Sequence, residues 1–150
     1  MGTFDGLNGL DEEIGAEEET KVVTIPEQKK RRPFHYWTVG GKEHRLKLTA
    51  AMISKLEGKY RTNVLNLISD DGLPPLSVML TIIQAAITPW EHGISYADVQ
   101  RIYDAWCDEG GNQIDLLSDV IMPTLTVSGF FTESQERSIA ESLKNTEELL

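Results

Sequence analysis

The side chains best suited to chemistry gather in one stretch of the sequence, FHYWTVGGKEHRLKLT, at residues 34–49. This stretch holds His35, His44, three aromatic rings, two glycines and several charges. Imidazoles can transfer protons or ligate a metal ion, and glycine-rich loops can bind phosphate. Whether any of this chemistry is expected depends on the spacing of the residues and on the elements that position them.

The three histidines, His35, His44 and His92, do not have the spacing of a metal site. They form neither HxxxH nor HExxH, and Cys107 is the only cysteine, which excludes a cysteine-based zinc site. The stretch DEGGNQID at 108–115 lacks the alternating oxygen ligands and the final Glu of a calcium loop. A helix stop followed by a capped helix start explains it better. We therefore expect neither a metal nor a cofactor.

No group of residues has the arrangement of catalytic machinery. The sequence VGGK lacks the spacing of a phosphate-binding loop, and no serine lies in GxSxG. Nothing places a base beside Cys107, so a half-buried thiol is expected there. The rings of Tyr96, Tyr103 and Trp106 recur at helical spacing, which is more typical of a core than of a cofactor or peptide groove. We therefore expect that the protein is not an enzyme.

The composition excludes further classes of function. A chain of 150 residues is long enough for one domain with a sizeable core. Its formal net charge of −10 argues against nucleic acid as a partner, because phosphate binding needs a basic surface. The most apolar stretch, at 76–87, is too short to span a bilayer, and the start of the chain lacks the features of a signal peptide. A cytoplasmic protein without nucleic-acid or membrane partners is expected.

The chain divides by composition into three parts. Residues 1–33 carry eight acids and five bases without a helical or strand period, so we expect a disordered acidic tail with one candidate strand at 22–25. The basic run KKRR at its end is better explained by a solvated linker than by a nucleic-acid or sorting signal. Residues 34–131 are expected to form a hairpin plus helical bundle. Residues 132–150 form a C-terminal helix whose sparse apolar positions leave it frayed or in need of a partner.

The hairpin is predicted from Gly40-Gly41, which lies between alternating residues and tolerates the positive φ of a tight turn. Two registers are open. A two-residue turn places Trp37 and Val39 on one face with Leu46 and Leu48, whereas a three-residue turn places Phe34 and Tyr36 on that face. In both registers one face is apolar and the other is aromatic and charged.

The rest of the chain predicts a mainly α fold, a small bundle of about five to six helices. Thr49 is a candidate N-cap for a helix over 50–60, and 64–68 form a second, short helix. The segment 76–88 is apolar nearly all round and belongs at the centre of the bundle. Capping-box spacings at 95–98, 112–115 and 132–135 start three more helices, and Pro123 should kink or restart one of them.

The order of these parts resembles a known family. A hairpin with GKEHRLKLT leads into AAMISKLEGKY, then LPPLSVMLTIIQAAI, HGISYADVQRIYDAWCDEGG and a closing SGFF. From about residue 39 to 131 this succession resembles the tail assembly chaperones of long-tailed phages and prophages of Gram-positive bacteria. The resemblance implies a protein of the host bacterial cytoplasm that binds the tape measure protein, keeps it soluble and helps recruit tail tube subunits. Such a chaperone is absent from the finished virion.

The surface that would contact partners is expected at two places. The hairpin has more aromatic rings than one buried face can use, and SGFF lies at the edge of the expected bundle. We predict that contacts to the client, or to a second copy of the chain, include Phe34, Tyr36, Trp37, Phe130 and Phe131. For each of these residues a place in the core is the alternative. For the whole protein the alternative is a non-enzymatic structural component of the virion, such as a neck or tail-completion protein.

Overall fold

A computed structural model describes residues 31–69 and 72–149. The elements are β2 (His35–Val39), β3 (Lys42–Leu46), α3 (Ala50–Tyr60), α4 (Val64–Ser69), α5 (Leu76–Ile87), α6 (Tyr96–Asp108), α7 (Gln113–Asp115), the π-helical segment η1 (Leu116–Ile121), α8 (Met122–Val127) and α9 (Glu133–Leu149). Because α7, η1 and α8 are continuous, these ranges contain six helical segments and one hairpin. The predicted mainly α fold with an N-terminal hairpin is confirmed. The predicted acidic tail, apart from its last three residues, and its candidate strand lie outside the described residues.

The hairpin uses a two-residue turn, which settles the register that the sequence left open. Val39 lies opposite Lys42, and Trp37 opposite His44, in an antiparallel pair. Gly40 and Gly41 both have positive φ, at 60° and 80°, as a tight hairpin turn of this hand requires. The inward face therefore carries Trp37 and Val39, while the outward face carries polar, charged and aromatic side chains.

Backbone hydrogen bonds attach the hairpin to helices far away in the sequence. The N–H of Lys47 donates to the carbonyl of Ala86 in α5 (3.1 Å), and the N–H of Leu48 donates to Oγ of Ser128 (2.9 Å). At the other end, the N–H of Gly40 donates to Oε2 of Glu109, just after α6 (2.7 Å). The hairpin is thus fixed at both its turn and its open end.

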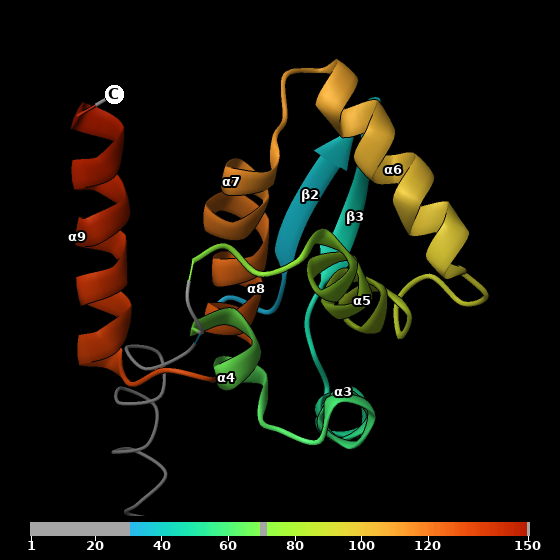
Figure 1. Cartoon of the computed structure of the whole chain (residues 1–150), viewed down its shortest axis with the longest axis horizontal. Helices are drawn as coiled ribbons and strands as arrows, with labels where there is room; N and C mark the ends of the chain where they lie inside the picture. The colour runs from blue at the N-terminus through green and yellow to red at the C-terminus, as the bar shows by residue number, and fades with distance from the viewer. Residues whose placement is uncertain (1–30, 70–71, 150) are drawn as a thin grey trace, which may run out of the picture. The chain divides into compact units, whose positions relative to one another are not determined.

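Helix α5 lies at the centre of the bundle, as its sequence predicts. It supplies six buried side chains and packs against α3, α6, η1 and β3. Figure 1 shows the hairpin between α6 on one side and the column of α7 and α8 on the other. The shared core consists of Trp37, Val39, Leu46, Leu48, Leu56, Val64, Met79, Leu80, Ile82, Ile83, Ala86, Ile87, Val99, Tyr103, Leu116, Val120, Ile121 and Leu125. In the part of the chain that the structure describes, no helix is long and apolar enough to cross a membrane.

The helices begin at the predicted caps. Oγ1 of Thr49 accepts from the N–H of Met52, and the Ser95–Asp98 capping box is complete. Oδ1 of Asn112 accepts from the N–H of Asp115, and Thr132 and Gln135 bond reciprocally at the start of α9. Each cap satisfies N–H groups that the first turn of a helix leaves unpaired.

Pro123 restarts a helix, as predicted, but without separating its two parts. The chain runs from Gln113 through the π-helical segment η1 into α8, where the proline occupies the first turn. A proline has no N–H, so it cannot donate to the carbonyl of Asp119, which lies four residues earlier. A wider π turn before the proline accommodates this change in the hydrogen-bond pattern.

Gly111 should be sensitive to any side chain. A Cβ at this position would overlap the ring of Trp106, which is itself packed against Trp37 and Tyr103. We expect Gly111→Ala to lower the free energy of unfolding by about 1–3 kcal/mol. Gly58→Ala is the matched control, because its Cβ meets open space in α3 and should stabilise the helix by about 0.5–1 kcal/mol. Urea denaturation measures both, and equal effects would contradict the packing at Gly111.

Candidate partner-binding surface

An aromatic patch lies on the outward side of the open end of the hairpin. It consists of Phe34, Tyr36, Arg45 and Trp90. The ring of Phe34 meets Trp90 edge-on at 4.8 Å and Tyr36 at 6.2 Å between centroids. The guanidinium of Arg45 lies 5.4 Å from the centroid of Phe34, within the range of a cation–π contact. The structure therefore brings together two of the predicted contact residues, Phe34 and Tyr36.

Two members of the aromatic patch were not predicted. Arg45 lies opposite Tyr36 in the hairpin, so the two-residue register alone would have placed them side by side. Trp90 comes from the connection between α5 and α6, and its indole N–H donates to the carbonyl of Lys47 (3.4 Å). Because this bond joins positions 43 residues apart, no local sequence pattern predicts it.

Trp37 belongs to the core, which corrects its place among the predicted contact residues. Its side chain is 3% exposed, whereas Tyr36, the next residue back along the strand, is 45% exposed. The ring of Trp37 packs edge-on against Trp106 at 5.7 Å, and its indole N–H has no hydrogen-bond partner among the described residues. A side chain enclosed in this way cannot contact a partner while the protein is folded.

Phe130 and Phe131 lie in the connection between α8 and α9. Both rings are half-buried and pack against the core. The N–H of Phe130 donates to the carbonyl of Leu125 in α8 (3.2 Å). These two residues come from a different part of the fold than the hairpin, so the five predicted residues do not form one site. A role in partner contacts stays a prediction for both.

A cleft of about 550 Å³ lies between the hairpin and the first half of α6. Its buried polar residue is His44, 4% exposed, whose Nδ1 lies 2.5 Å from Oε1 of Glu91. Nζ of Lys42 lies 3.6 Å from the other carboxylate oxygen. His35 does not face His44 across the hairpin, because Trp37 lies opposite His44 and Leu46 lies opposite His35.

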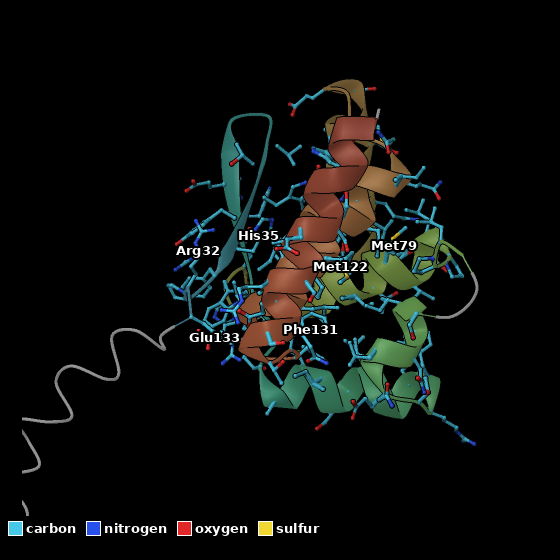
Figure 2. The ribbon with its side chains drawn as sticks, turned by 90° about the vertical axis from the view of Figure 1, so that its left-hand side faces the viewer. Arg32, His35, Met79, Met122, Phe131 and Glu133 are labelled. Atoms are coloured by element: carbon cyan, nitrogen blue, oxygen red, sulfur yellow. The ribbon has the colours of Figure 1, made fainter. Side chains whose placement is uncertain are left out.

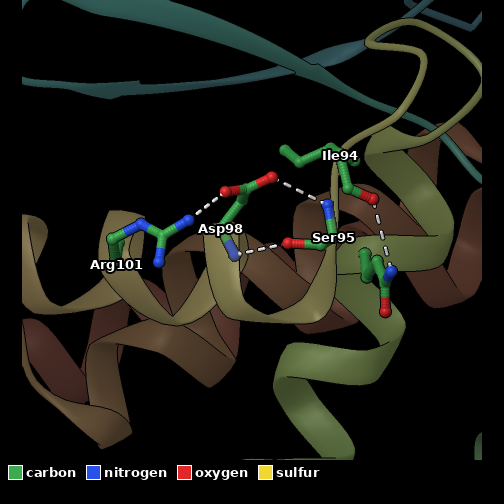
Figure 3. Close-up of polar contacts among 5 residues, drawn as sticks. Ile94, Ser95, Asp98 and Arg101 are labelled. Atoms are coloured by element: carbon green, nitrogen blue, oxygen red, sulfur yellow. Dashed lines mark hydrogen bonds and ion pairs between the residues drawn. The ribbon is translucent and has the colours of Figure 1, made fainter.

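The wall of this cleft is held by hydrogen bonds at the start of α6, drawn in Figure 3. Asp98 accepts from the N–H of Ser95 (2.9 Å) and pairs with Arg101. These bonds from Ser95 and Arg101 lower the pKa of Asp98. Among the described residues, no serine, threonine or cysteine lines the cleft, and His44 is paired there with Glu91. The pairing with Glu91 ties the hairpin to the α5–α6 connection.

Helix α9 lies over a cavity of about 220 Å³. We call its base the α9 seat, and it is formed by Arg32, His35, Met122, Pro123, Thr126 and Val127. From α9, the residues Glu136, Ile139 and Ala140 line the same cavity. Figure 2 shows α9 passing in front of Met122, with Arg32 and His35 beside it.

Little apolar burial holds the first half of α9. Of its side chains up to position 142, Glu136 and Ile139 are half-buried and the others are exposed. Half-burying an isoleucine contributes roughly 1 kcal/mol, whereas ordering each backbone residue costs about 1–2 kcal/mol. The described side chains of α9 therefore contribute little apolar burial against the rest of the protein.

His35 connects the start of β2 to the π-helical segment. Burial of the ring lowers the pKa of His35 from its ordinary value of 6.5, and the nearby charge of Arg32 lowers it further. A hydrogen bond from the ring to the backbone carbonyl of Asp119 opposes this shift. That carbonyl is the one to which Pro123 cannot donate. His35 thus links the start of β2 to the helical turn that precedes Pro123.

Substitutions at Trp37 should affect stability because the residue is core. We expect Trp37→Ala to lower the free energy of unfolding by about 3–5 kcal/mol. Trp37→Phe should cost much less, because the unpartnered indole N–H leaves no hydrogen bond to lose. Tyr36→Ala is the matched control and should change stability by less than about 0.5 kcal/mol. Thermal or urea unfolding measures all three, and a stable Trp37→Ala protein would contradict the core assignment.

The lowered pKa of His35 predicts a pH dependence of stability. The unfolded chain binds a proton at His35 more tightly than the folded protein does, so protonation favours unfolding. The contribution of His35 to the free energy of unfolding is fully present above the ordinary pKa of 6.5. It is lost as the pH falls toward the lower pKa of the folded protein. The urea concentration at the midpoint of unfolding should therefore decrease as the pH is lowered from about 7.5 to about 5.

Replacing the imidazole identifies the source of that effect. His35→Gln should reduce the pH dependence of the urea midpoint. His92→Gln should leave it unchanged, because His92 is exposed in a turn. An identical pH profile for wild type and His35→Gln would assign the effect to another group.

Comparison with known proteins adds one result to this geometry. A family model described as "Family of unknown function (DUF6096)" matches residues 32–150, which is most of the chain and all of the hairpin and helices described above. No curated protein and no solved structure matches the sequence. The matched region starts three residues before β2, close to the predicted boundary between the tail and the folded part. The chain is therefore a member of the DUF6096 family.

Proposed function

We propose that this protein is a tail assembly chaperone of a long-tailed phage or prophage. In the host bacterial cytoplasm it binds the tape measure protein, keeps it soluble and helps recruit tail tube subunits. It acts by binding alone, without catalysis or a cofactor, and it is left out of the finished virion. The observation that carries this proposal is the aromatic patch of Phe34, Tyr36, Arg45 and Trp90.

The composition of the aromatic patch suits a protein interface. Tyrosine, tryptophan and arginine are the residues that most often dominate the free energy of protein binding. Tyr36 is 45% exposed, and the rings of Phe34 and Trp90 are half-buried, so apolar surface is available around a guanidinium. A long, helical, apolar client could bury its side chains against such rings.

The aromatic patch is also rigid, which lowers the entropic cost of binding. Phe34 is held between Trp90 and Tyr36, and Trp90 is hydrogen-bonded to the backbone at Lys47. Side chains that are already ordered lose little freedom when a partner binds. The acidic character of the whole chain, with a net charge of −10, helps keep a complex with an apolar client in solution.

The first test is co-purification of the full chain with the tape measure protein of the same phage or prophage. We expect the double variant Tyr36→Ala/Arg45→Ala to bind at least about tenfold more weakly, because it removes two anchors of the aromatic patch. The matched control is Thr38→Ala/Glu43→Ala, the next outward-facing pair toward the turn. It should bind like wild type. Equal binding by both double variants, with circular dichroism unchanged, would reject the aromatic patch as the contact surface.

The second test separates a chaperone from a structural component of the particle. Mass spectrometry of purified virions should find the tape measure and tail tube proteins but not this chain. Recovery of the chain in a fixed ratio to tail tube subunits would instead support a neck or tail-completion protein.

A further inference from the structure

We propose that the α9 seat is a second binding surface, which accepts an amphipathic helix of the partner after α9 has moved away. The partner helix carries an acidic residue at position i and apolar residues at i+3 and i+4. The proposal rests on the function above only for the identity of the partner as the helical client. The existence of a helix-accepting seat is independent of that function.

The seat is shaped for a helix because it already holds one. Glu136, Ile139 and Ala140 are spaced i, i+3 and i+4, so they lie on one side of α9, and all three line the cavity. A second helix with the same spacing would present its side chains to the same base.

The charge of Arg32 in the seat favours an acidic residue, whereas His35, with its lowered pKa, adds no charge near neutral pH. Arg32 and His35 line the cavity on the side of the hairpin, and Glu136 lines it from α9. A carboxylate at the position of Glu136 is favoured by the guanidinium of Arg32, and a basic side chain there would be repelled. The first element of the partner pattern therefore follows from the seat.

The cavity itself explains why another helix could bind better than α9 does. Apolar side chains of Met122, Pro123 and Val127 line space that Ile139 and the methyl group of Ala140 leave unfilled. Atoms that line such a space lack van der Waals partners on one side. A larger apolar residue in place of Ala140 would supply these contacts, and the exposed first half of α9 contributes little apolar burial.

The test uses the full chain and a labelled synthetic peptide of residues 132–150 in which Ala140 is replaced by Leu. Ile139→Asp in the full chain loosens α9 and leaves the seat intact. We expect this variant to bind the peptide about tenfold more tightly than wild type, measured by fluorescence anisotropy. The peptide with Ala140→Leu should also bind more tightly than the peptide of natural sequence, since it fills the cavity.

A charge exchange tests the contact itself. Arg32→Glu added to Ile139→Asp should weaken peptide binding about tenfold, and Glu136→Arg in the peptide should restore it. Lys59→Glu on α3 is the matched charge reversal outside the seat and should have no effect. Circular dichroism and thermal unfolding verify that each variant is folded.

Three results would overturn the proposal. The first is peptide affinity that does not change when α9 is loosened. The second is an effect of Arg32→Glu no larger than that of Lys59→Glu. The third is a wild-type dimer in light scattering whose α9 helices cross-link between copies, which would assign the seat to a second copy of the chain. Peptide binding with no capture of the tape measure protein would reject the proposed function and leave the seat in place.

Discussion

The two-residue turn at Gly40-Gly41 is the constraint on which the rest of the structure depends. Because residues alternate between the faces of a strand, the turn length decides which half of the hairpin is buried. With this turn, Trp37 lies in the core beside Trp106, whereas Tyr36 lies on the outer face beside Arg45. A turn longer by one residue would exchange these faces, and the core and the aromatic patch would both be lost.

The hairpin also determines where the C-terminal part of the fold is attached. Immediately after β3, the backbone at Lys47 and Leu48 bonds to α5 and to Ser128 at the end of α8. At the start of β2, His35 reaches the carbonyl of Asp119 in the π-helical segment. This two-stranded sheet therefore attaches both the central helix α5 and the interrupted helix that carries Pro123.

Adjacent residues of the first strand serve two different surfaces. Phe34 and Tyr36 point outward into the aromatic patch, whereas His35 lines the α9 seat. A partner that binds both the aromatic patch and the α9 seat would contact β2 from two sides.

The sequence by itself determined the local structure, because each signal for it lies within a few residues. The glycine pair predicted the hairpin, the caps at Thr49, Ser95, Asn112 and Thr132 predicted the helix starts, and the apolar run of α5 predicted its central position.

Only the tertiary structure decided the register, the burial of Trp37, the addition of Trp90 to the aromatic patch and the pairing of His44 with Glu91. Each of these depends on packing between segments distant in sequence, as does the α9 seat. Packing of that kind produces no periodic pattern in a single sequence, because the environment of each residue depends on neighbours that come near only when the chain folds.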